Sequence, residues 1–170
     1  QAKTLFPYTT LFRSDSWTYT CLGEVRKALF GSPKILRQLG TNPVTVGALL
    51  DIPFISPLNS FNGQFVQLDD GCPLKHAERL LGHEVPTFLL ALELAAATEQ
   101  LAFGPAIAAR RYMESGALVE IKVVGWQVSE PLYLACNGDR VLSSDQRLIS
   151  AAVLSALSAL TELDAASLRC

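Results

Sequence analysis

Segments that favour strands alternate with segments that favour helices along most of the chain, and this alternation is the strongest constraint on its fold. The expected strands are Val25–Phe30, residues 53–58, a strand within residues 62–72 that ends in a turn at Asp70-Gly71, Leu101–Phe103, Leu118–Val123 and residues 131–137. Each expected helix follows an expected strand. This order predicts an α/β architecture in which helices cover the faces of a sheet.

Most of the expected helices begin with a residue that can cap or open a helix. They run from Ser32-Pro33 to Gly40, from Thr87 to about Ala97, from Gly104-Pro105 to Ser115-Gly116, and from Ser144 to about Leu160, with a shorter turn after Thr45. In open α/β sheets such strand-to-helix junctions lie where ligands bind. The free N–H groups of a helix start favour an anion. The junctions together predict a small-molecule pocket, although capping alone explains any single one.

The composition indicates a buried core and excludes two classes of partner. The chain has 170 residues, of which 49% are hydrophobic and 18% charged, with a net charge of −2. This length suits one domain or a large piece of one. No basic cluster of the kind that DNA-binding domains carry is present in the sequence. The longest apolar candidate, Leu148 to Leu160, contains three serines and is too short to span a membrane.

Motifs that carry catalysis or bind metals are missing from the sequence. It contains no G-x-S-x-G, P-loop, G-x-G-x-x-G or H-E-x-x-H pattern, and His83-Glu84 has no second histidine four residues on. The four cysteines are far apart and form no C-x-x-C pair, so we expect no zinc site. Asp69-Asp70 are interpreted as turn residues. We therefore predict no catalytic residues, no metal and no cofactor.

The first segment has a different character from the rest. Thr4–Ser14 reads "TLFPYTTLFRS", and its codons can be written so that they match a common sequencing adapter read in frame. A native strand is the alternative, because several of these residues favour extended backbone. We predict that residues 1–14 are not native, that 15–163 form a partial domain and that 164–170 are a tail.

From about Leu22 to Leu160 the order of segments resembles the effector-binding domain of LysR-type transcriptional regulators. Three blocks carry the resemblance: "GEVRKALFGSPKILRQLGTNPVTVGALLDIPFI", "PTFLLALELAAATEQLAFGPAIAARRYMESGALVEI" and "GWQVSEPLYLACNGDRVLSSDQRLISAAV". The resemblance implies a fold like type 2 periplasmic binding proteins, with two subdomains joined by two crossover strands. The crossovers would be Val25–Phe30 and Leu132–Cys136. The chain would then hold the second subdomain, the crossovers and part of the first subdomain.

The resemblance also implies a ligand site and partners. Candidate ligand-binding residues are Thr87 and Phe88 at one helix start, Gly104 and Pro105 at the next, and more weakly Ser32. The effector would be small and either anionic or aromatic. The parent protein would be a cytoplasmic homo-oligomer that binds DNA through a helix-turn-helix domain, which the chain is expected to lack, and no membrane partner is implied. RNA polymerase is a further possible partner of the parent.

Two other readings remain open from the sequence. The first is a piece of a periplasmic solute-binding protein, which shares this fold and serves transport. The second is an enzyme of unknown α/β type, against which the missing pairing of nucleophile and base weighs. A subdomain without its partner strands would expose sheet edges, so we also expect the isolated chain to self-associate.

Genomic DNA upstream of the Asp15 codon tests the expected start of the native sequence. We expect it to encode a basic helix-turn-helix domain and the rest of the first subdomain, in place of Thr4–Ser14. A signal peptide there would favour the transport reading. Genomic codons for "TLFPYTTLFRS" in frame with Asp15 would contradict the prediction of an adapter-derived segment.

Overall fold

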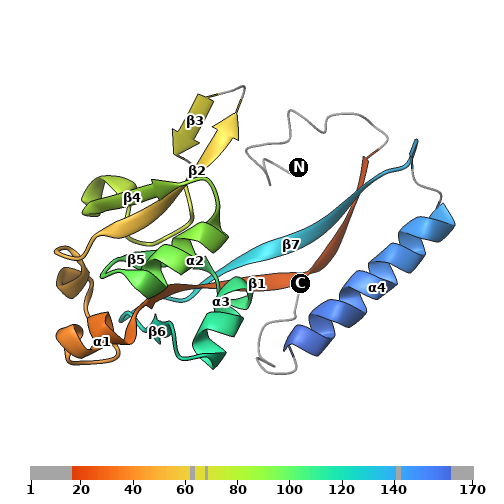
Figure 1. Ribbon diagram of the computed structural model, residues 1–170. Coiled ribbons are helices and arrows are strands. Elements are labelled where there is room, and N and C mark those ends of the chain that lie inside the picture. Colours follow the sequence, from red (N-terminus) through yellow and green to blue (C-terminus); the bar gives the residue numbers. More distant parts are fainter. Residues whose placement is uncertain (1–16, 62–63, 68, 141–142, 162–170) are drawn as a thin grey trace. The chain divides into compact units, whose positions relative to one another are not determined.

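The computed structural model describes residues 17–61, 64–67, 69–140 and 143–161 (Figure 1). The predicted non-native segment and the predicted tail lie outside these ranges, so both stay predictions. The chain forms two compact units, one from residues 1–24 and 131–170 and the other from Val25–Glu130. We call the first unit 1 and the second unit 2.

The described elements follow the predicted alternation. The strands are β1 (Trp17–Gly31), β2 (Phe54–Phe61), β3 (Gln64–Gln67), β4 (Leu81–Val85), β5 (Leu101–Pro105), β6 (Val119–Ile121) and β7 (Val128–Asn137). The helices are α1 (Pro33–Leu39), η2 (Val46–Leu49), η3 (His76–Glu78), α2 (Phe88–Ala97), α3 (Ala106–Glu114) and α4 (Ser143–Thr161), where η marks a short 3-10 helix. All six predicted strands are present, and β1, β2 and β7 extend beyond their predicted ends.

One mixed sheet organises the strands. Its order is β3-β2-β5-β1-β6, with β4 also paired to β2 and β7 also paired to β1. β2 runs parallel to β4 and to β5, whereas β1 runs antiparallel to β5 and to β6. The carboxyl ends of β2, β4 and β5 therefore lie at the same edge of the sheet.

Both faces of the central strands are buried, because successive side chains of a strand point to opposite faces. Phe30 and Ile55 pack in a cluster with α2 and α3, while their neighbours Leu29 and Phe54 pack in a second cluster with α1 and η2. This two-sided burial explains why the central strands read as continuous apolar runs rather than as alternating patterns.

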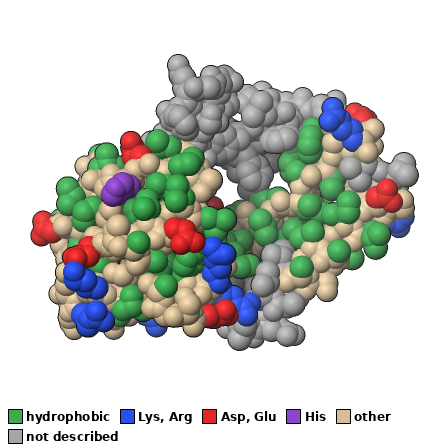
Figure 2. Space-filling view, viewed as in Figure 1, with side chains coloured by type: hydrophobic (Ala, Val, Ile, Leu, Met, Phe, Trp, Pro, Cys, Tyr) green, Lys and Arg blue, Asp and Glu red, His purple; other side chains and the backbone are tan. Residues whose placement is uncertain are grey.

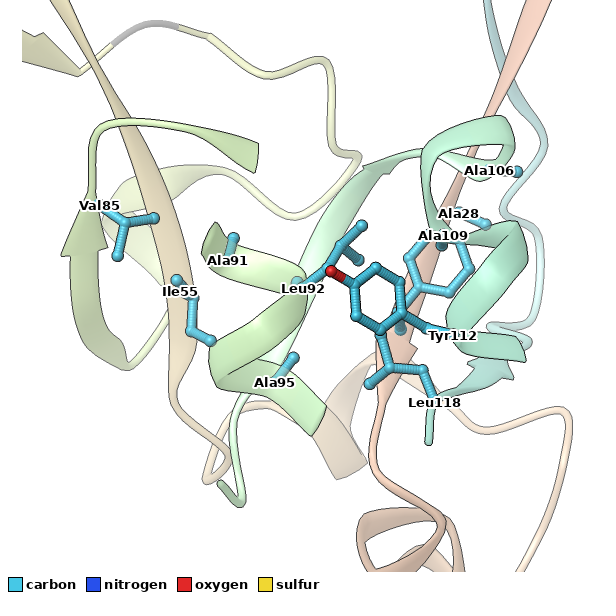
Figure 3. Packing of buried hydrophobic residues seen from close by; sticks show 12 residues of the cluster. Ala28, Ile55, Val85, Ala91, Leu92, Ala95, Ala106, Ala109, Tyr112 and Leu118 are labelled. Atoms are coloured by element: carbon cyan, nitrogen blue, oxygen red, sulfur yellow. The ribbon is translucent and has the colours of Figure 1, made fainter. Parts of the chain in front are cut away.

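Small side chains let α2 and α3 lie close to the sheet (Figure 3). The first cluster contains the buried alanines Ala28, Ala91, Ala95, Ala102, Ala106 and Ala109. Between the two helices Tyr112 packs its ring on this cluster, and its hydroxyl donates to the Glu93 carboxylate at 2.5 Å. The helix pair is therefore held by close alanine packing and by hydrogen bonds from Tyr112 and Arg111 to the Glu93 carboxylate.

Two predicted helix ends agree with the structure, a third lacks the side-chain cap bond and a fourth is wrong. Gly40 ends α1 in the left-handed region, with φ 71°, and the Thr87 side chain caps α2. Ser32 stands at the N-cap of α1 but makes no side-chain cap bond. The prediction that Ser144 caps the last helix is wrong, since α4 begins at Ser143 and the Ser144 hydroxyl instead donates to Asp145 Oδ1.

A buried ion pair, which the sequence pattern did not predict, holds the loop between β3 and β4. Arg79 donates from Nη1 to Asp70 Oδ2 at 2.6 Å, from Nη2 to Oδ1 at 2.8 Å and from Nε to the Leu74 carbonyl at 2.7 Å. Its guanidinium lies 5.3 Å from the centre of the Phe54 ring. The Arg79 side chain is 3% exposed, so this pair is part of the core of unit 2.

The same pair sets the ionisation of Asp70. Burial alone would raise the pKa of this carboxyl. The hydrogen bonds from Arg79 and from the Cys72 N–H, together with the charges of Arg79 and His76, outweigh burial and leave the pKa below its ordinary value. Asp70 thus acts as the charged anchor of the loop as well as a turn residue.

Asp70→Asn should lower the free energy of unfolding by about 3–5 kcal/mol at neutral pH, because it leaves Arg79 buried without its charge partner. A carboxyl with a lowered folded-state pKa stabilises above its unfolded pKa of about 4, and this contribution is lost as the pH falls through the folded-state value. Urea unfolding at several pH values should therefore show the variant approaching the parent below about pH 4.

The matched control is Glu114→Gln, which removes the exposed i,i+4 pair with Arg110 and should cost only about 0.3–0.5 kcal/mol. Equal losses in the two variants, or a loss at Asp70 that does not depend on pH, would contradict the buried-anchor account.

Candidate functional site

The candidate site lies at the sheet edge where three parallel strands end. The register pairs Ile55 of β2 with Ala102 of β5, and Pro57 of β2 with Val85 of β4. Helix α2 begins shortly after β4, and α3 begins directly after β5. Two helix N-termini therefore meet the same edge, as the junction pattern in the sequence predicted.

Thr87 lies at the start of α2 with its side chain exposed. Its Oγ1 accepts a hydrogen bond from the Leu90 N–H at 3.3 Å. The hydroxyl proton is not used by this bond, so the same side chain can still donate to a ligand.

Phe88 and Gly104, which are sixteen residues apart, are brought into direct contact. A Cβ atom placed on Gly104 would lie 2.6 Å from Cε2 and Cζ of the Phe88 ring. The ring is half-buried and covers a buried glycine. Gly104 therefore supports the ring instead of presenting a surface of its own, and Phe88 and the half-buried Pro105 form the accessible part of this contact.

Ser32 lies away from the other candidates. Because β1 is antiparallel to β5, Lys27 is opposite Pro105 and Phe30 is opposite Ala102. The end of β1 that leads to Ser32 is therefore at the opposite edge of the sheet, and Ser32 is only 8% exposed. Ser32 was predicted to lie with the other helix starts because a capping pattern in the sequence does not reveal the direction of the strand before it.

Charged groups near the site are engaged in pairs. The Lys27 Nζ donates to the Asp70 carbonyl at 2.7 Å and pairs with the Glu130 carboxylate. Arg111 lies farther away, in the last turn of α3, and pairs with Glu93. The first turns of α2 and α3 hold no acidic side chain, so nothing in those turns opposes an anion. Lys27 was not predicted from the sequence because its partners are distant in the chain.

The described part of the chain offers no metal centre. It contains no group of three or more His, Cys, Asp or Glu side chains that could hold a metal ion.

Across the same residues, no helix is long and apolar enough to cross a membrane. His83, which begins an incomplete metalloprotease-like motif, has its Nδ1 2.6 Å from Gln100 Nε2.

Comparison with known families identifies the domain. The family model of the LysR substrate binding domain matches residues 7–158. The chain belongs to this family. Its fold is the type 2 periplasmic-binding-protein-like α/β fold, and β1 and β7 occupy the positions expected for the two crossover strands. The match begins inside the segment that we predict to be non-native, and it does not test that prediction.

Solved structures of transcriptional regulators share the fold at low sequence identity. A probable transcriptional regulator from Pseudomonas aeruginosa is 19% identical, with a TM-score of 0.59 over 80% of this chain and 44% of that one. The regulatory domain of MexT, a transcriptional activator in the same organism, is 17% identical, with a TM-score of 0.59 over 84% and 66%.

The regulatory domain of MetR from Neisseria meningitidis is 12% identical, with a TM-score of 0.56 over 81% of this chain and 62% of that one. The chain thus spans less than two thirds of each of these three structures. No curated protein sequence matches it significantly.

Gly104→Ala should disturb the site by forcing the Phe88 ring to move. Overpacking of this kind costs about 1–3 kcal/mol, which thermal or urea unfolding can measure. Replacing Phe88 by Leu in the same variant should recover part of the loss. Gly47→Ala is the control, since a Cβ atom there meets nothing within 4 Å. Equal effects at Gly47 and Gly104, or no recovery with Phe88→Leu, would refute the contact.

Proposed function

We propose that the chain is the effector-binding portion of a LysR-type DNA-binding transcriptional regulator and acts without catalysis. The observation that carries this proposal is the family match over residues 7–158. It is supported by the two paired strands, β1 and β7, which both continue from one unit into the other. The parent protein would be cytoplasmic.

The effector is proposed to bind at the starts of α2 and α3. Thr87 would donate a hydrogen bond, while the first N–H groups of each helix, which have no intrahelical partner, would face an anionic group. The Phe88 ring and Pro105 would contact the body of the ligand. A small carboxylate with an aromatic or apolar body fits these groups best.

DNA contact is proposed for a separate domain of the parent protein. The net charge of the chain is −2, and on the face seen in Figure 2 basic and acidic side chains are interspersed. DNA-binding surfaces instead gather lysine and arginine on one face. A second copy of the parent is the other proposed partner. Solute transport is not favoured, because the matching family and the similar solved structures are regulators.

A thermal-shift screen of small mono- and dicarboxylates and benzoates tests the proposal. A ligand at one hundred times its Kd should add about 2.7 kcal/mol of stability. Without ligand, Thr87→Ala should lose the helix cap, which costs about 1 kcal/mol of stability. With ligand, the variant should in addition show a smaller ligand-induced shift than the parent. Phe88→Leu should weaken the shift for benzoates more than for succinate.

Thr45→Ala is the matched control, since Thr45 also stands before a helical turn but its side chain makes no cap bond. It should leave the ligand-induced shift unchanged. If no acid stabilises the chain, the proposed effector class is wrong. If a ligand stabilises Thr87→Ala as much as the parent, binding occurs elsewhere.

A further inference from the structure

The chain crosses the boundary of unit 2 on two paired strands, and the Lys27 ammonium group links these strands there. β1 and β7 pair with each other, and the boundaries of unit 2 fall at Val25 on β1 and Glu130 on β7. Lys27 lies two residues inside this boundary, and its Nζ pairs with the carboxylate of Glu130. The ion pair therefore spans both strands where they leave the unit.

The same ammonium group also holds a third segment. Lys27 Nζ donates to the Asp70 carbonyl oxygen at 2.7 Å. Gly71 lies against the pair, since a Cβ atom there would be 3.0 Å from Glu130 Oε1 and 3.4 Å from Lys27 Nζ. Its φ of +73° also favours glycine. The loop thus packs its backbone on the ion pair.

The far end of this loop is fixed in the core. The Asp70 carboxylate accepts hydrogen bonds from both terminal nitrogens of Arg79. The Arg79 guanidinium in turn packs on the Phe54 ring of β2. A continuous set of contacts therefore runs from β2 through the loop to Lys27 and Glu130.

We propose that Lys27 is a clasp, which limits the separation of β1 and β7 at the boundary of unit 2 and couples them to the loop of residues 69–79. An exposed ion pair would contribute little to such a role. Glu130 is 52% exposed, but the Lys27 side chain is only 11% exposed, and its ammonium group donates to acceptors on two different segments. Removing the Lys27 ammonium group should loosen the pairing of β1 and β7 locally and leave the core folded.

Amide hydrogen exchange of the chain, without any ligand, tests the clasp. Lys27→Met should raise exchange in peptides covering residues 17–24 and 131–137 by about threefold to tenfold, and leave β5 unchanged, because local openings differ from global unfolding. Glu130→Gln, which keeps the bond to the Asp70 carbonyl, should give a smaller rise. The double variant should match Lys27→Met, since both residues act through one pair.

Lys34→Met is the matched control, because Lys34 also pairs with a glutamate, Glu99, but lies on α1, beyond the end of β1 and outside the boundary region. It should change exchange in neither strand. Unchanged exchange at residues 17–24 in Lys27→Met, or an equal rise in β5, would overturn the clasp. Because no ligand is used, failure here is distinguishable from failure of the proposed effector function.

Discussion

The burial of β5 on both faces is the constraint on which the rest of unit 2 depends. Leu101 and Phe103 point into the cluster beneath α1, and Ala102 points into the cluster beneath α2 and α3. Burying one large apolar side chain stabilises a fold by about 1.5–3 kcal/mol. Both faces must therefore be covered by helices, and the small Ala102 leaves room for them. The backbone groups of β5 are paired with β1 on one side and β2 on the other.

The position of the candidate site follows from this core. A helix that covers a parallel strand must begin near the carboxyl end of the strand before it, so α2 and α3 both begin at one edge. Phe88 can cover the end of β5 because Gly104 has no side chain there. The candidate site thus combines helix N–H groups, the Thr87 hydroxyl and one ring. We propose that it serves the reversible recognition of a small molecule.

Local signals in the sequence predicted local structure well, and long-range contacts poorly. Thr87 was correctly predicted as a helix cap, since its bond lies within one turn. The strand Leu81–Val85 was missed, because most of its side chains are exposed and its apolar pattern is weak. The pair of Asp70 and Arg79 becomes evident only when the loop is folded. Ser32 was grouped with the wrong edge because capping patterns carry no information on strand direction. The family could be recognised from the sequence because the resemblance rests on the order of strand and helix segments, which does not depend on long-range contacts.

Chemical-shift mapping tests most directly the claim that this domain binds an effector at the two helix starts. The isotope-labelled chain would be titrated with benzoate and with succinate, and amide shifts would be followed by NMR. The account predicts saturable shifts, described by a single Kd, centred on residues 87–90 and 106–108. Saturable shifts centred on the opposite edge of the sheet, near Ser32, would contradict it, as would shifts that never saturate.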